Sequence, residues 1–68
     1  MNKYYIVQVL HKGKEEVNAV IEQRFEEDQL EEAICKVSEL LKILDTSKCV
    51  IEIVKWCNDV ECKVIFGI

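Results

Sequence analysis

The four cysteines are the side chains of this 68-residue chain with the widest chemical repertoire. Four thiolates can hold a zinc ion, but zinc sites commonly take ligands from closely spaced pairs such as C-x-x-C, and no such pair occurs. We therefore expect no metal site. In a short secreted chain an even number of cysteines would indicate disulfides, yet nothing in the sequence signals secretion. The cysteines are Cys35, Cys49, Cys57 and Cys62.

Cys57 and Cys62 flank a predicted turn, and the length of that turn decides whether their thiols meet. A loop of four residues would set the two cysteines opposite each other. A loop of two residues, Asn58 and Asp59, would instead pair Cys57 with Val60. The sequence leaves both loops open and therefore predicts no bridge at this position.

Groups suited to catalysis are sparse, with one histidine, two serines and one threonine in the chain. His11 falls in or beside a predicted tight turn, where an exposed histidine is more common than a general base. The motifs G-x-x-x-x-G-K-[ST], G-x-G-x-x-G and H-E-x-x-H, which bind phosphates, dinucleotides and zinc, do not occur. We therefore expect a protein without enzymatic activity and without a cofactor.

Acidic residues are concentrated in one stretch of the chain. Eight acids and a single base, Arg24, lie between positions 15 and 32, although the net charge of the chain is only −4. Carboxylates at the start of a helix favour the positive end of its dipole, which explains part of this asymmetry. An alternative is an inhibitor of the phage type, whose carboxylates imitate nucleic acid and block a nucleic-acid-binding protein. The candidate acidic surface comprises Glu22, Glu26, Glu27, Asp28, Glu31 and Glu32.

Tyr4 and Trp56 offer a second alternative, because aromatic side chains on a four-stranded sheet can stack bases. Lys3 and Lys55 are close to them in sequence. Binding to phosphates requires clustered Lys and Arg, however, and the charge balance of this chain is acidic. We therefore do not expect nucleic acid to be the partner.

Two predicted strands, residues 3–10 and 48–57, are apolar on both faces. A three-residue loop of His11, Lys12 and Gly13 is predicted to join the first to an alternating strand that runs to Arg24, with Gly13 tolerating positive φ. A two-residue loop at Lys12 and Gly13 would swap the faces of the first strand. The three-residue loop places Tyr5, Val7 and Val9 on one face with Val17, Ala19 and Ile21.

The sequence Asp28-Gln29-Leu30-Glu31 has the form of a capping box, so we expect a helix to begin near Gln29. Apolar side chains then recur at helical spacing, which leaves Cys35 on the opposite, exposed side. This apolar stripe comprises Leu30, Ala33, Ile34, Val37, Leu40, Leu41 and Leu44.

A last alternating strand follows the turn at Asn58 and Asp59. Cys49 and Cys62 fall at core-facing strand positions, where a thiol acts as a small hydrophobe. The inward residues of the last strand are predicted to be Val60, Cys62, Val64, Phe66 and Ile68. A helix between two hairpins places the third strand antiparallel to the first. We therefore predict a single α+β domain over residues 1–68 with the element order ββαββ. Numbered along the chain, its four strands should lie in the sheet order 2-1-3-4.

One helix covers one face of such a sheet, and a chain of this size has a marginal core. The other face is therefore predicted to present an apolar centre, which is typical of an interaction surface. We expect a protein-interaction module that forms a homodimer sheet to sheet and binds another macromolecule, with edge pairing through the last strand as a competing geometry. The candidate interface comprises Tyr4, Ile6, Leu10, Val50, Val54 and Trp56.

Half of the residues are apolar, a third are charged, and proline is absent, as in a compact folded chain. No stretch approaches the roughly 18 consecutive apolar residues of a membrane span, and residues 1–10 lack the small-residue cleavage site of a secretory signal. We therefore expect a cytoplasmic protein.

Overall fold

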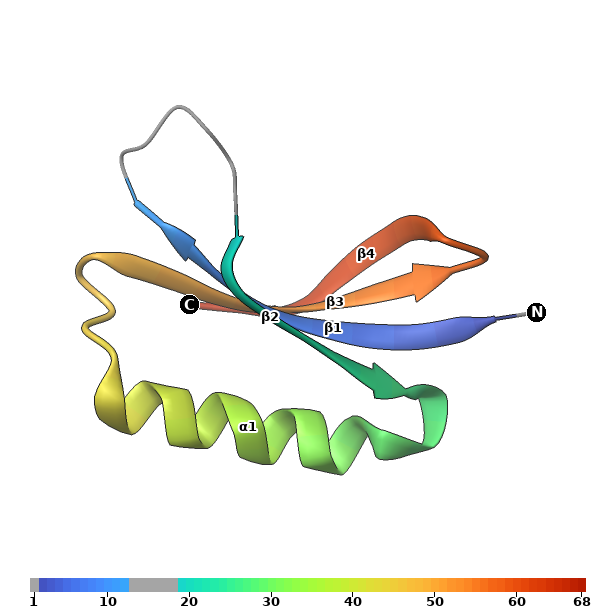
Figure 1. The fold of residues 1–68 in the computed structure, drawn as a ribbon, viewed down its shortest axis with the longest axis horizontal. Helices are drawn as coiled ribbons and strands as arrows, with labels where there is room; N and C mark the ends of the chain where they lie inside the picture. The colour runs from blue at the N-terminus through green and yellow to red at the C-terminus, as the bar shows by residue number, and fades with distance from the viewer. Residues whose placement is uncertain (1, 13–18) are drawn as a thin grey trace.

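An antiparallel sheet of four strands carries one helix on one face (Figure 1). The computed structural model describes residues 2–12 and 19–68. The sheet order is β2-β1-β3-β4, which confirms the predicted ββαββ fold. The elements are β1 (Lys3–His11), β2 (Ala19–Glu26), a 3₁₀ turn η1 (Glu27–Gln29), α1 (Leu30–Ile43), β3 (Cys49–Cys57) and β4 (Val60–Gly67).

The core lies between α1 and the two central strands, because β1 and β3 are apolar on both faces. Val7 pairs with Ile53, and Val9 pairs with Ile51, so four branched side chains form the centre of the helix-facing side. Burying apolar surface of this kind is the main stabilising contribution to a small domain. Tyr5, Phe25, Ala33, Val37 and Leu40 complete the buried cluster.

The predicted register of β2 was wrong, although the facing of β1 was right. Val7 pairs with Gln23, where the sequence predicted Val17, and this pairing is inconsistent with a three-residue loop. Gly13 and Val17 lie outside the described residues. A register shift by an even number of residues keeps every side chain on its face, so the alternating pattern could not exclude it. The observed register places Phe25 opposite Tyr5, where its ring is buried in the core.

The helix begins at Leu30, one residue beyond the predicted start, but the expected cap at Asp28 is not used. The 3₁₀ turn η1 precedes α1, and the Gln29 side chain accepts a hydrogen bond of 2.9 Å from the backbone N–H of Glu26. Glu26 therefore holds the N-cap position of this turn, two residues before Asp28. The Gln29 side-chain amide, at the third position of the turn, thus gives the Glu26 backbone N–H a hydrogen-bond partner that it would otherwise lack.

A two-residue turn joins β3 to β4. Asn58 and Asp59 have φ of 52° and 63°, as a tight hairpin turn requires, and Cys57 pairs with Val60. The shorter of the two predicted loops is therefore the correct one.

Two register shifts interrupt the pairing of β4 with β3, and they change the predicted facing of β4. Phe66 pairs with Ile53 on the helix side, as expected, but Val64 pairs with Val54 on the opposite side. Bulges of this kind increase the local twist of a strand. Figure 1 shows the β3–β4 hairpin rising away from α1, and all of β4 is exposed, including Cys62, for which burial was predicted.

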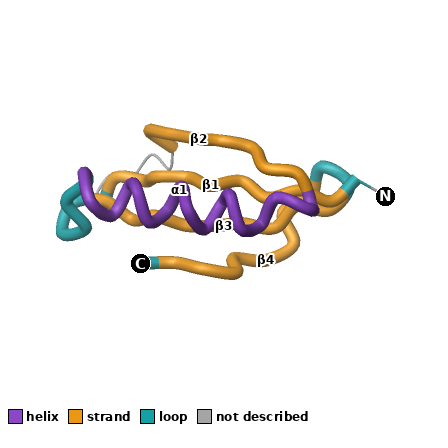
Figure 2. Tube along the Cα trace, turned by 90° about the horizontal axis from the view of Figure 1, so that it is seen from below, coloured by secondary structure: helices purple, strands orange, loops and turns teal. Residues whose placement is uncertain are grey.

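The helix lies over β1 and β3, with β4 to one side (Figure 2). Among the described residues, α1 packs against β1, β2 and β3 but makes no close backbone approach to β4. The predicted apolar stripe is consequently buried along only part of its width. Ala33, Val37 and Leu40 are buried, whereas Ile34 and Leu41 are exposed toward β4.

Candidate interaction surfaces

The six predicted interface residues do lie together on the sheet face away from α1, which we call the open face. Antiparallel pairing of β1 with β3 makes them three cross-strand pairs. Between two of these pairs, the Gln8 side chain donates a hydrogen bond of 2.9 Å to the Glu52 carboxylate. The pairs are Tyr4 with Trp56, Ile6 with Val54, and Leu10 with Val50.

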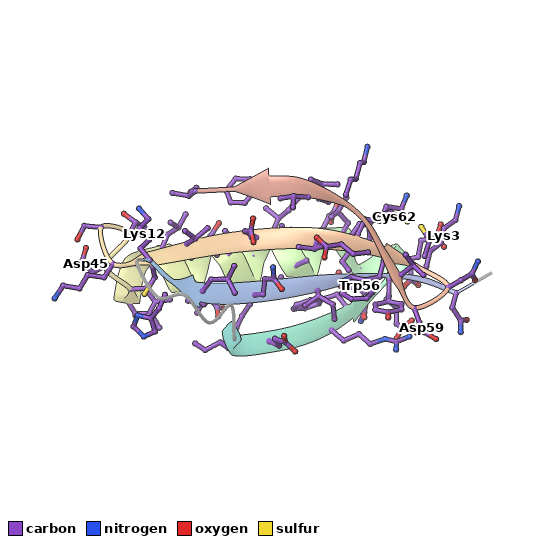
Figure 3. All side chains as sticks on the ribbon, turned by 90° about the horizontal axis from the view of Figure 1, so that it is seen from above. Lys3, Lys12, Asp45, Trp56, Asp59 and Cys62 are labelled. Atoms are coloured by element: carbon purple, nitrogen blue, oxygen red, sulfur yellow. The ribbon has the colours of Figure 1, made fainter. Side chains whose placement is uncertain are left out.

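The open face is more covered by its own chain than the sequence indicated. Tyr4 is 8% exposed and Val54 is 1% exposed, while the other four residues are half-buried. Curling of the β3–β4 hairpin contributes, because Asp59 in its turn accepts a hydrogen bond of 3.1 Å from the Tyr4 hydroxyl. Trp56 and Asp59 lie at the same end of the sheet (Figure 3). Pairing of two copies through this face remains a prediction, with less apolar surface left to support it.

The aromatic residues of the open face are engaged with each other. The rings of Tyr4 and Trp56 are nearly parallel, with centroids 6.1 Å apart, and the Arg24 guanidinium lies 3.9 Å from the centroid of Tyr4. Partial burial, followed by the hydrogen bond to Asp59, raises the pKa of Tyr4 above its ordinary value of 10.0. A base could stack on Tyr4 only after Arg24 moved, so this arrangement gives no support to nucleic-acid binding on the sheet.

An apolar depression lies on the helix side of the sheet, between α1 and β4. This α1–β4 groove has a volume of about 470 Å³, and no charged side chain lines it. Ile34 on the helix is 50% exposed and Phe66 on the strand is 38% exposed. The lining residues are Leu30, Ile34, Val37, Ser38, Leu41, Ile53, Ile65 and Phe66.

Sequence reasoning missed this groove because it assigned Ile34, Leu41 and Phe66 to the core. One signal was present in the sequence: Val64, Ile65 and Phe66 are three consecutive apolar residues in a strand treated as alternating. Such a run exposes apolar side chains on both faces of an edge strand unless something covers them. In this structure the register shift beside Ile65 brings both Ile65 and Phe66 to the groove.

The outer edge of β4 carries unpaired backbone groups and few charges. Ile51 and Ile68 exchange two backbone hydrogen bonds, of 3.1 and 3.3 Å. In an antiparallel ladder the next residue, Gly67, then directs its N–H and C=O groups away from β3. Residues 64–68 contain no charged side chain. An apolar edge with free backbone groups is prone to pair with another strand.

The opposite edge of the sheet is protected by charge. Glu22, Gln23, Arg24 and Glu26 of β2 are all exposed, and the Arg24 guanidinium lies 3.2 Å from the Glu26 carboxylate. Charged side chains along an edge strand oppose pairing with a second sheet. The two edges of this sheet therefore differ sharply in charge.

All six residues of the predicted acidic surface are exposed. They follow one another along β2, η1 and the first turn of α1, where Glu31 and Glu32 complement the positive end of the helix dipole. Within the described ranges, Glu26 alone of the six has an ion-pair partner. Imitation of nucleic acid by these carboxylates stays a prediction.

The described part of the chain contains no group of three or more His, Cys, Asp or Glu side chains placed to hold a metal ion. Cys35 is exposed on α1, as predicted, and Cys49 is half-buried and packs against the core. No helix among residues 2–12 and 19–68 has the length and apolar character needed to cross a bilayer.

The chain was compared with protein-family models, with curated proteins and with solved structures, and none of the three comparisons found a match.

Proposed function

We propose that this protein is a non-enzymatic interaction module that associates with a second copy of itself through the α1–β4 groove and the outer edge of β4. The observation that carries the proposal is the uncharged groove, whose walls include exposed Ile34, Leu41, Ile65 and Phe66. Apolar surface concentrated in this way in a small soluble domain is typical of an association site.

The β4 edge supplies the geometry of the association. Two β4 strands that pair antiparallel about a twofold axis perpendicular to the sheet would form one continuous eight-stranded sheet. Both helices would then lie on the same side of that sheet, and the two grooves would face each other across the axis. The backbone groups of Gly67 would gain hydrogen-bond partners in the same step.

A second copy suits this surface better than a charged partner does. The groove has no charged lining, and residues 64–68 have no charged side chain, so a charged ligand would find no countercharge there. Another copy brings a matching apolar groove and a matching free edge. A chain of this length also benefits from the additional burial, because a domain of about 60 residues buries only about 60% of its unfolded surface.

Sedimentation velocity of the wild-type chain over a dilution series, in the presence of a reducing agent, tests this proposal. We expect a dimer at high micromolar concentration that dissociates on dilution and is not weakened by added salt, because the contact is apolar. A chain that sediments as a monomer throughout the high micromolar range would contradict self-association.

A further inference from the structure

We propose that Cys57 and Cys62 form a redox-sensitive pair that closes reversibly into an intramolecular disulfide across the β3–β4 hairpin. This modification site is independent of the self-association proposed above, because it depends only on the geometry of one hairpin.

The hairpin places Cys62 in an unusual position. Cys57 pairs with Val60 and Trp56 pairs with Glu61, so an uninterrupted ladder would pair Lys55 with Cys62. Instead, Lys55 pairs with Lys63, and Cys62 is left as the extra residue of a bulge. The Cys62 side chain is therefore not held opposite Lys55, where a regular ladder would place it.

The thiol of Cys62 points back toward the turn. Its Sγ atom lies 3.8 Å from the carbonyl oxygen of Val60, the residue directly opposite Cys57. Interaction with the Cys57 side chain, followed by partial burial, raises the pKa of Cys62. Proximity across adjacent strands is the geometric requirement for a disulfide, and the bulge supplies it where the turn length alone would not.

Oxidation by a small disulfide such as oxidised glutathione proceeds in two exchanges. The exposed Cys62 thiolate attacks one glutathione sulfur, forms a mixed disulfide and releases one glutathione thiolate. The Cys57 thiolate then attacks the Cys62 sulfur and releases the second glutathione thiolate. Two protein thiols are oxidised to one disulfide, one glutathione disulfide is reduced to two thiols, and the number of protons is conserved overall.

The test is a peptide map after exposure of the folded chain to oxidised glutathione and alkylation of the remaining thiols. Cleavage after Lys55 and Lys63 releases residues 56–63, which contain Cys57 and Cys62 and no other cysteine. We expect this peptide to carry neither glutathione nor alkyl groups and to be two hydrogen masses lighter than the dithiol. Cys35, exposed and alone on α1, is the internal control and should carry glutathione.

A Cys57→Ser variant keeps the folded hairpin and removes the second thiol, so its Cys62 should accumulate as the glutathione adduct. Three results would overturn the proposal. The wild-type peptide could carry glutathione on both cysteines, or both of its thiols could stay free while Cys35 reacts. Cys62 could also form its disulfide with a second chain and not with Cys57. Because self-association is measured under reduction, failure of either proposal is distinguishable from failure of the other.

Discussion

Replacement of Phe66 by glutamate should weaken self-association by about 100-fold, equivalent to about 2.7 kcal/mol. Phe66 lines the α1–β4 groove and is the aromatic residue there, and aromatic side chains carry much of the energy of protein interfaces. A carboxylate in the same place would be removed from water in the dimer without a partner of opposite charge. The dissociation constant from sedimentation velocity, compared with that of the wild-type chain, measures the effect.

Two further variants separate loss of the contact from loss of the fold. Ile34→Glu places the charge on the helix wall of the same groove and should weaken the dimer in the same way. Ile43→Glu is the matched control, because Ile43 is also on α1, is 76% exposed and does not line the groove. If Ile43→Glu weakened the dimer as much as Phe66→Glu does, the assignment of the interface to the α1–β4 groove would be contradicted. If Phe66→Glu had the same dissociation constant as the wild-type chain, pairing through the open face would be favoured instead.

Truncation of Ile51 to alanine should lower the free energy of unfolding by about 2–5 kcal/mol. A domain of this length has a total stability of roughly 3–10 kcal/mol, so the variant should lose a large fraction of its stability. Ile51 is 0% exposed, pairs with Val9 in the centre of the sheet, and belongs to the core beneath α1. Its removal leaves a cavity that the strands on either side can fill only in part.

Urea denaturation followed by circular dichroism measures this loss, at one fixed protein concentration because dimerisation adds to apparent stability. Ile43→Ala serves as the control, since an exposed substitution changes stability by about 0.5 kcal/mol or less. Similar losses in Ile51→Ala and Ile43→Ala would show that Ile51 is not at the centre of the core.

The order of the strands was predictable because only two segments of the chain are apolar on both faces. Such strands belong in the middle of a sheet, and a helix between two hairpins leaves one arrangement that puts both there. The register of β2 was not predictable, because a shift of six residues from Val17 to Gln23 opposite Val7 preserves the alternation of faces. Burial of Phe25 opposite Tyr5 is a tertiary contact that distinguishes the two registers.

The candidate surface was predictable in part. The six open-face residues were correctly placed beside one another, because their adjacency follows from strand order and alternation. Their burial depends on the curl of the β3–β4 hairpin, and the α1–β4 groove depends on register shifts within β4. A bulge moves side chains such as Val64 to the other face without leaving a distinctive composition in the sequence.

The central claim is that two copies pair through β4. Amide hydrogen exchange of Gly67, followed by NMR at protein concentrations below and above the dissociation constant of the dimer, tests it most directly. Gly67 directs its N–H away from β3, so in the isolated chain this amide has no partner in the sheet. With nine-tenths of the chains in a β4-paired dimer, its exchange should slow by about tenfold, while the outward-directed amides on the free edge of β2 exchange unchanged. An unchanged Gly67 amide in a sample that sediments as a dimer would contradict pairing through β4.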